Sequence, residues 1–246
     1  MIGKLKLRHL ELLEAENIDY ATLMVELNGY KNTWWNKKFI FLKSFAKTFK
    51  FIEYVKGLDP SLIERDPNCK IKCPESIDDI TFMAMMELQT LLNTDSEKSL
   101  ALLMAEAIAI SCFSENHKID FDVDGLEFED FKNRVFESPA IEMLGISNWI
   151  NKELKESQQH WSQQFFSVEV IDKDYEQAGG HKMSAFNIIN TIKSICSDFN
   201  YTEKEAWQVS YSLTQINSLS KATSAYIQNQ MSIIKEARMK TNRNKK

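Results

Sequence analysis

Apolar residues recur at intervals of three and four along most of the chain, the spacing that places them on one face of an α-helix. The stretch 36–56 shows this clearly, with Phe39, Leu42 and Phe45 on one side and Gly57 as a stop signal. The alternating run KLKLRHL at 4–10 is the exception and favours a short β segment. The pattern therefore predicts a mainly α fold, a multi-helix bundle preceded at most by a short N-terminal β segment.

Polar residues with capping chemistry mark the starts of two central helices. Ser76 with Asp79 is expected to cap a helix that runs through Leu92, and TDSE at 94–97 is a capping box for a helix over 98–113. Such side chains satisfy the backbone N–H groups that the first helical turn leaves free. We expect this pair of helices to form a hairpin in the core.

Further helices are predicted downstream. Residues 127–136 form a short helix, and Ser138 with Pro139 begins a longer one that continues toward Phe166. Two last helices follow. The first, at 184–199, carries regularly spaced apolar residues, and the second, at 203–238, opens with a capping box; the residues involved are Phe186, Ile189, Ile192, Ile195, Thr202 and Glu205.

Proline and glycine mark the expected boundaries between these parts. Pro60, Pro67 and Pro74 fall within one short stretch, and Gly179 and Gly180 lie among polar neighbours. The predicted organisation is an N-terminal helical unit (1–58), a Pro-containing connection (59–75), a central helical body (76–170), a linker (171–182), and a C-terminal helical pair with a basic tail (183–246).

Composition narrows the function. With 43% hydrophobic and 26% charged residues, the chain has the profile of a globular protein that buries a core. The four cysteines, with no apolar leader before them, favour reduced thiols in a cytosol, and no apolar run is long enough to cross a membrane. The sequence contains no G-x-S-x-G, P-loop or G-x-G-x-x-G motif, so we expect neither an enzyme nor a cofactor.

One acidic run matches the opening of a calcium-binding loop. Asp120, Asp122, Asp124 and Gly125 follow the D-x-D-x-D-G pattern, but Phe131 occupies the twelfth position, where such a loop needs a bidentate glutamate. The favoured interpretation is an acidic, solvated turn before a helix, because carboxylates are stabilised at the positive helix end. Calcium binding is the alternative.

The cysteines are also candidate zinc ligands. Cys69 and Cys73 are separated by three residues, while Cys112, His117 and His181 lie elsewhere. A structural zinc site would require a second closely spaced pair of Cys or His, and the sequence contains none. We therefore expect free thiols and no metal.

Two basic segments suggest nucleic-acid binding as an alternative function. Lys43, Lys47 and Lys50 lie opposite the phenylalanines of the 36–56 stretch, and Arg243 belongs to a basic C-terminal tail. Phosphate backbones bind such patches, but amphipathic helices also carry lysines on their solvated face. A net charge of −5 does not favour general nucleic-acid binding.

Aromatic residues provide candidate contacts with other proteins. Trp149, Trp161, Phe165 and Trp207 are large amphipathic side chains near predicted element ends. Side chains of this kind anchor protein interfaces when they are exposed. We select these four residues, with the 203–238 helix, as the candidate protein-binding elements.

Three segments resemble a known group of proteins. The 77–110 segment, IDDITFMAMMELQTLLNTDSEKSLALLMAEAIAI, resembles the central hairpin of tail assembly chaperones and related structural-module proteins of tailed bacteriophages. Residues 128–154 and 184–217 are similar to the helical continuation and the closing helical pair of such proteins.

The resemblance implies a non-enzymatic phage structural or assembly protein that acts through protein contacts. Its expected partners are phage structural proteins or further copies of itself, with no membrane involved. A chaperone would act in the host cytoplasm during assembly, whereas a virion component would remain in the particle.

Overall fold

The computed structural model describes residues 6–8, 62–94, 98–168 and 186–243. Within these ranges the fold is mainly α, as predicted: seven α-helices and one 3-10 helix are present, and no strand. The elements are η3 (Ile77–Asp79), α4 (Phe82–Asn93), α5 (Leu100–Asn116), α6 (Leu126–Phe136), α7 (Ala140–Phe166), α9 (Asn187–Phe199), α10 (Glu203–Trp207) and α11 (Tyr211–Arg243).

The chain divides into two compact units that interleave along the sequence. Unit 1 comprises Met1–Glu75 and Ala84–Glu153, and unit 2 comprises Ser76–Met83 and Leu154–Lys246. The division falls within α4 and α7, so each of these helices contributes to both units. The predicted central body at 76–170 is thus shared between the units, and the predicted linker at 171–182 lies outside the described residues.

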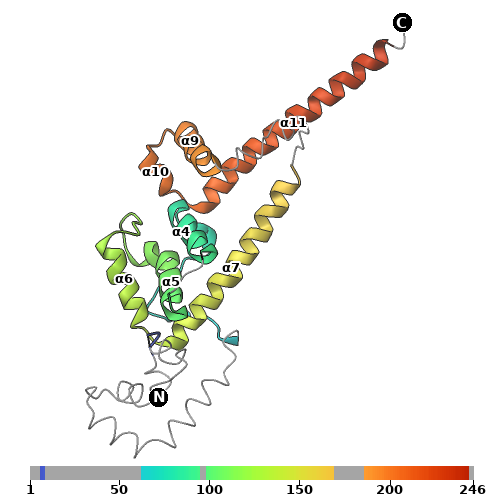
Figure 1. The fold of residues 1–246 in the computed structure, drawn as a ribbon. Coiled ribbons are helices and arrows are strands. Elements are labelled where there is room, and N and C mark those ends of the chain that lie inside the picture. Colours follow the sequence, from blue (N-terminus) through green and yellow to red (C-terminus); the bar gives the residue numbers. More distant parts are fainter. Residues whose placement is uncertain (1–5, 9–61, 95–97, 169–185, 244–246) are drawn as a thin grey trace, which may run out of the picture. The chain divides into compact units, whose positions relative to one another are not determined.

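Unit 1 is built around α5 and α6, which pack side by side (Figure 1). The centre of this packing is Phe113 of α5, whose ring contacts Phe121, Phe128 and Phe131 at centroid distances of 5.8 to 6.0 Å. The ring of His117 stacks on Phe113 at 4.7 Å. All four phenylalanines are buried, so a closed aromatic core fixes α6 against α5.

The irregular segment 62–75 contacts α5 through Asn116 and contacts α7 through several residues. The amide of Asn148 in α7 donates to the carbonyl of Ile63 at 2.9 Å, and the Arg65 guanidinium lies 4.7 Å from the centroid of the Trp149 ring. Gly145 allows the close approach, because a Cβ there would lie 2.4 Å from the Glu64 carbonyl oxygen. A stretch with little secondary structure is therefore held in place by side chains of α7.

In the described residues, the N-terminal β segment is reduced to an isolated bridge with a few neighbouring hydrogen bonds. Lys6 forms an isolated antiparallel bridge with Pro139, and the N–H of Leu7 donates to the carbonyl of Ser138 at 2.9 Å. This pairing also corrects the expected start of α7. Ser138 is not its N-cap, since its hydroxyl donates to the Arg134 carbonyl and α7 begins at Ala140; the helix does extend to Phe166.

In unit 2, one antiparallel bridge interrupts two helices that the sequence predicts to be continuous. Thr81 pairs with Ser210, the N–H of Phe82 donates to the Val209 carbonyl at 2.7 Å, and the N–H of Tyr211 donates to the Ile80 carbonyl at 2.8 Å. Backbone groups used in this pairing are not available for helical hydrogen bonds. Both predicted long helices are therefore broken here.

The capping residues were nonetheless placed correctly at these two sites. Ser76 and Asp79 form a capping box, but on the three-residue η3, with α4 beginning afterwards at Phe82. Thr202 and Glu205 form the other box, on α10, while α11 begins separately at Tyr211. The predictions for 76–92 and 203–238 were therefore correct about the capped starts and wrong that one continuous helix follows each of them.

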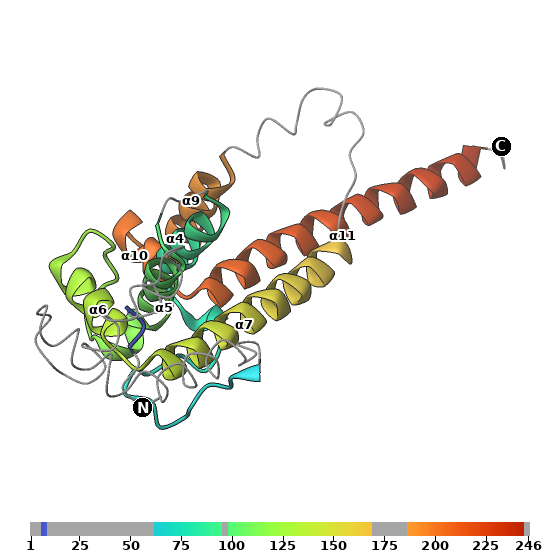
Figure 2. The same ribbon diagram turned by 60° about the horizontal axis from the view of Figure 1, so that its bottom comes forward.

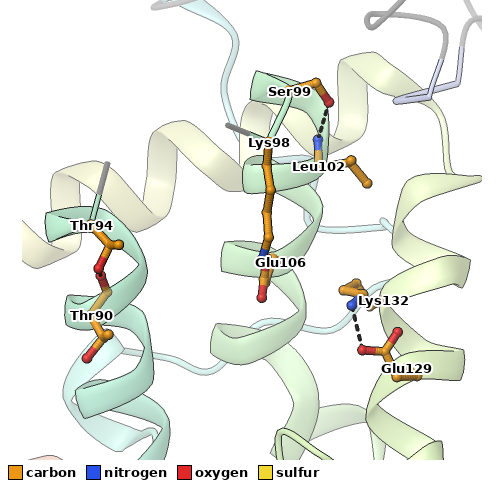
Figure 3. A network of polar contacts seen from close by, with 8 residues as sticks. All are labelled: Thr90, Thr94, Lys98, Ser99, Leu102, Glu106, Glu129 and Lys132. Carbon is orange, nitrogen blue, oxygen red and sulfur yellow. Dashed lines mark hydrogen bonds and ion pairs between the residues drawn. The ribbon is translucent and has the colours of Figure 1, made fainter. Parts of the chain in front are cut away.

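The start of α5 differs from the predicted capping box (Figure 3). The Thr94 hydroxyl donates to the Thr90 carbonyl at the end of α4, and the cap of α5 is Ser99, which accepts from the Leu102 N–H. Lys98 adds an ion pair with Glu106 at 2.6 Å. The remaining residues of that box, 95–97, lie outside the described part of the chain.

Candidate protein-binding site

Unit 2 contains an apolar groove between α9 and α10. Its volume is about 440 Å³, and it is lined by Ile189, Ile192, Lys193, Cys196, Ser197, Glu203 and Trp207. The α9 residues of this set are spaced at three and four, so one flank of the helix forms one wall. Glu203 and Trp207, at the two ends of the short α10, form the other. We call this feature the α9–α10 groove.

The turn between the two helices is set by a left-handed residue. Asn200, with φ of 56°, ends α9, and its N–H donates to the Cys196 carbonyl. Asparagine tolerates this conformation because its short side chain can hydrogen-bond locally. Thr202 then caps α10, and its backbone N–H and hydroxyl both donate to the Glu205 carboxylate, holding the pKa of that carboxyl below its usual range.

Trp207 is fixed at the groove by an aromatic contact. Its ring stacks on Phe82 at a centroid distance of 5.5 Å and an interplanar angle of 23°. Phe82 is itself buried, so it supports Trp207 from within unit 2. A tryptophan held in this way offers a preorganised apolar wall to a ligand.

Polar side chains join α9 to α11. Lys221 forms an ion pair with Asp198 at 2.7 Å and also donates to the Ser194 hydroxyl, to which Asn217 donates at 3.0 Å. The hydrogen bonds from Lys221 and Asn217 hold the pKa of the Asp198 carboxyl below its usual range. These contacts fix α9 to α11 through Ser194 and Asp198, neither of which lines the groove.

Apolar side chains remain exposed around the groove. On or next to α9, Phe186 is 50%, Ile188 45%, Ile189 52% and Phe199 39% exposed, while Ile192 and Ile195 are buried. Beyond its contacts with α9, α11 continues away from both short helices (Figures 1 and 2) and carries further exposed residues: Ile227, Met231, Ile233, Ile234 and Met239. Unit 2 thus displays apolar side chains well beyond the groove itself.

The four aromatic residues selected from the sequence occupy different settings. Trp207 lines the groove, whereas Trp149 lies under Arg65 in unit 1. Trp161, in the unit 2 part of α7, donates its indole N–H to Asp78 at 3.1 Å, and Phe165 is half-buried on the same helix. The structure brings only Trp207 to the candidate site, and the other three stay predictions.

The acidic run forms the predicted turn before a helix. The N–H of Asp124 donates to the Asp122 carboxylate at 3.1 Å, the N–H of Gly125 donates to the Asp122 carbonyl, and α6 follows with Gly125 as its N-cap. Asp120, Asp122 and Asp124 are exposed. In the described residues, no group of three or more His, Cys, Asp or Glu side chains has the geometry to hold a metal ion.

The basic residues of the alternative function lie outside the described residues or at their C-terminal end. Lys43, Lys47 and Lys50 lie outside the described residues, as does His181, and the side chain of Arg243 at the end of α11 is not described. Among the described helices, none combines the length and apolarity needed to cross a bilayer.

Sequence reasoning missed the groove residues other than Trp207. Ile189 and Ile192 were recognised as part of an apolar helix face, but their spacing does not reveal which of them a neighbouring helix covers. A signal was present in the adjacent pair Ile188 and Ile189, which widens the apolar arc beyond what one packing partner covers.

Comparison of the sequence with protein-family models and with curated proteins, and of the fold with solved structures, found no match.

Proposed function

We propose that this protein acts without catalysis, by holding an apolar helix of another polypeptide in the α9–α10 groove. The observation that carries the proposal is that the groove between Ile189 of α9 and Trp207 of α10 adjoins further exposed apolar side chains on or next to α9. Contiguous exposed apolar surface of this kind is typical of protein-interaction sites. Grooves between helices are a recurrent way of binding an amphipathic helix.

The surface around the groove favours a polypeptide over a small molecule. A volume of about 440 Å³ would also accept a small ligand. Such a ligand would leave Phe186, Ile188 and Phe199 exposed to water, because these residues do not line the groove. A helix laid along α9 would cover them as well. Each isoleucine fully removed from water contributes about 1.5 to 3 kcal/mol.

Two charged side chains at the groove indicate which charges a bound helix would carry. Lys193 of α9 and Glu203 of α10 are exposed and stand on opposite walls. A bound helix with an acidic residue along one edge and a basic residue along the other would meet both. We therefore infer an amphipathic helix with an apolar stripe between edges of opposite charge.

The resemblance of the 77–110 segment extends the proposal to a biological setting. We propose that the partner is a structural protein of a tailed bacteriophage, held during assembly or within the particle. Apolar helices of tail proteins need cover before they assemble, and the α9–α10 groove offers such cover. Mass spectrometry of particles from the phage that encodes this chain would separate a resident component from a transient chaperone.

A labelled peptide tests the binding mode directly. The probe is a fluorescein-labelled amphipathic helix with leucines at heptad a and d positions, glutamates along one edge and lysines along the other. Fluorescence anisotropy with the full chain should show saturable binding that Trp207→Ala weakens by about tenfold or more, because a buried aromatic anchor contributes over about 1.4 kcal/mol.

A matched pair of variants controls for nonspecific hydrophobic binding of the peptide. Ile189→Ser removes an apolar side chain at the groove, and Leu126→Ser removes one that is 81% exposed in unit 1. We expect the first to weaken peptide binding and the second to leave it unchanged. Equal effects of the two variants, or no saturable binding by the unmodified chain, would contradict the proposal.

A further inference from the structure

Three thiols of unit 1 lie close together, in different environments. Cys73, on the irregular segment 62–75, lies with its sulfur 3.6 Å from that of Cys112 in α5, and the Cys112 S–H donates to it. Cys112 is fully buried, whereas Cys73 is partly exposed. Cys69, four residues before Cys73, instead donates its S–H to the Glu142 carboxylate at 3.2 Å. The pair Cys73–Cys112 is therefore in contact, with one member reachable from solvent.

The side-chain amide of Asn116 acts as a clamp that holds the two cysteines near each other. The Asn116 side chain accepts from the N–H of Lys72 at 3.1 Å and donates to the Lys72 carbonyl at 2.7 Å. It also donates to the carbonyl of Cys112, one turn earlier in α5. Asn116 thus ties the residue before Cys73 to the helical turn that carries Cys112. Pro74, buried directly after Cys73, restricts the backbone on the other side.

The two thiols differ in reactivity in a way that assigns their roles. The hydrogen bond from Cys112 lowers the pKa of Cys73; burial opposes this, and the Arg65 guanidinium adds to it. The same hydrogen bond, together with burial, raises the pKa of Cys112 well above its usual value. Burial and Glu142 raise the pKa of Cys69 to about 11. Because the thiolate is the nucleophile, Cys73 is the reactive sulfur of the three.

We infer that Cys73 and Cys112 form a reversible disulfide when the protein meets a hydroperoxide, with Cys73 attacking and Cys112 resolving. The Cys73 thiolate attacks the hydroxyl oxygen of the hydroperoxide, the O–O bond breaks, and a sulfenic acid forms as an alkoxide leaves, or hydroxide when the oxidant is hydrogen peroxide. The Cys112 sulfur then attacks the Cys73 sulfur; its proton leaves with the sulfenic hydroxyl as water, and the S–S bond forms. Two electrons pass from the thiol pair to the peroxide, and a dithiol reductant reverses the change.

The sulfurs need to approach by about 1.6 Å, from contact to a bond length of about 2.05 Å. Cys73 lies on a non-helical segment and Cys112 on α5, so we expect the approach to come mainly from the Cys73 side. A disulfide would fasten the 62–75 segment to α5 covalently. The proposed disulfide would therefore add a covalent bond to a segment that is otherwise held in unit 1 mainly by side-chain contacts.

Peptide mapping of the unmodified full chain provides the first test. The reduced protein is treated with hydrogen peroxide, blocked with an alkylating reagent, digested without reductant and analysed by mass spectrometry. We expect a Cys73–Cys112 linked peptide that disappears after dithiothreitol, with Cys69 and Cys196 alkylated. A link between Cys69 and Cys73, or peroxide treatment that leaves both Cys73 and Cys112 free, overturns the inference.

Variants test the assigned roles. Cys112→Ala should stop the reaction at a sulfenic acid on Cys73 that dimedone traps, and Cys69→Ser should leave disulfide formation intact. Asn116→Ala should slow disulfide formation by about tenfold while Cys73 still reacts with dimedone, since misplacing reacting groups by about 1 Å has effects of this order or larger. Dimedone trapping at Cys112 in a Cys73→Ser chain, at the rate seen for Cys73, would overturn the roles.

Discussion

The aromatic core of unit 1 and the α9–α10 groove of unit 2 are made of similar side chains but differ in how completely they are covered. In unit 1, the rings of Phe113 and Phe131 meet others from α5, α6 and the loop between them, and both residues are buried. In unit 2, α9 buries Ile192 and Ile195 but leaves Ile188 and Ile189 half-exposed.

The difference arises from the length of the neighbouring elements. α6 has 11 residues and lies along α5, whereas α10 has only five and cannot cover the full apolar arc of α9. An apolar face that its own fold leaves uncovered contributes less to stability and remains available for binding. Unit 1 is therefore expected to be sensitive to changes in packing, and the groove of unit 2 to be tolerant of them.

The largest expected effect comes from opening the unit 1 core. Phe131→Ala should reduce the free energy of unfolding by roughly 3 to 5 kcal/mol, because it removes a fully buried ring and leaves a cavity. Ile189→Ala, at the groove, should change it by less than about 0.5 kcal/mol. Urea denaturation followed by circular dichroism measures both. Similar losses for the two variants would break the comparison.

A smaller loss is expected where α7 meets the irregular segment. Gly145→Ala would place a Cβ 2.4 Å from the Glu64 carbonyl oxygen, and backbone must move to relieve the overlap. We expect a loss of about 1 to 3 kcal/mol. The displaced segment should also make Cys69 react faster with a thiol reagent. Ser147→Ala on the same helix serves as the control, and equal stability of the two variants would contradict the tight packing.

How far the sequence predicted the fold depends on whether the deciding contacts are local. The helical period and the caps at Ser76 and Thr202 are local, and these predictions were confirmed. The interruptions at Thr81 and Ser210 were missed because their cause is a backbone pairing across more than a hundred residues. Neither stretch contains a glycine or proline that would have signalled a break.

The candidate site was less predictable, for the same reason. Trp207 could be selected from its side-chain type, but Trp149 and Trp161 could not be separated from it, because the contacts that cover them come from Arg65 and Asp78. The exposure of Ile189 depends on where α10 ends. The contact between Cys73 and Cys112 likewise depends on a long-range clamp by Asn116 that spacing alone does not reveal.

The groove has one position whose change should affect both stability and binding. Asn200→Ala should reduce the free energy of unfolding by about 1 kcal/mol, because alanine has no polar side chain whose local hydrogen bonds offset the strain of a positive φ. Asn200→Gly should be neutral or slightly stabilising. We expect the alanine variant to weaken peptide binding as α10 shifts, and the glycine variant to retain it. A loss of stability in both variants would show that the Asn200 side chain, and not its backbone, is what matters.

The smallest expected effect is an acid dependence in unit 1. Glu137 accepts from Lys6 at 2.6 Å and from Arg8 at 2.8 Å. Partial burial raises the pKa of the carboxyl, but the two cations outweigh this and hold it below its usual 4.5. A lowered folded-state pKa gives stability that is present above pH 4.5 and is lost as the pH falls through the folded value.

Glu137→Gln should therefore destabilise the protein by less than about 1 kcal/mol at neutral pH, since exposed ion pairs contribute little. The difference from the unmodified chain should shrink toward zero as the pH is lowered below 4.5. Urea midpoints measured over a pH series would show this. A difference that stays constant with pH would mean that Glu137 acts through packing, and the attachment of residues 6–8 to unit 1 would then depend on Leu7, which is fully buried, and on the backbone bonds from Leu7 and Arg8.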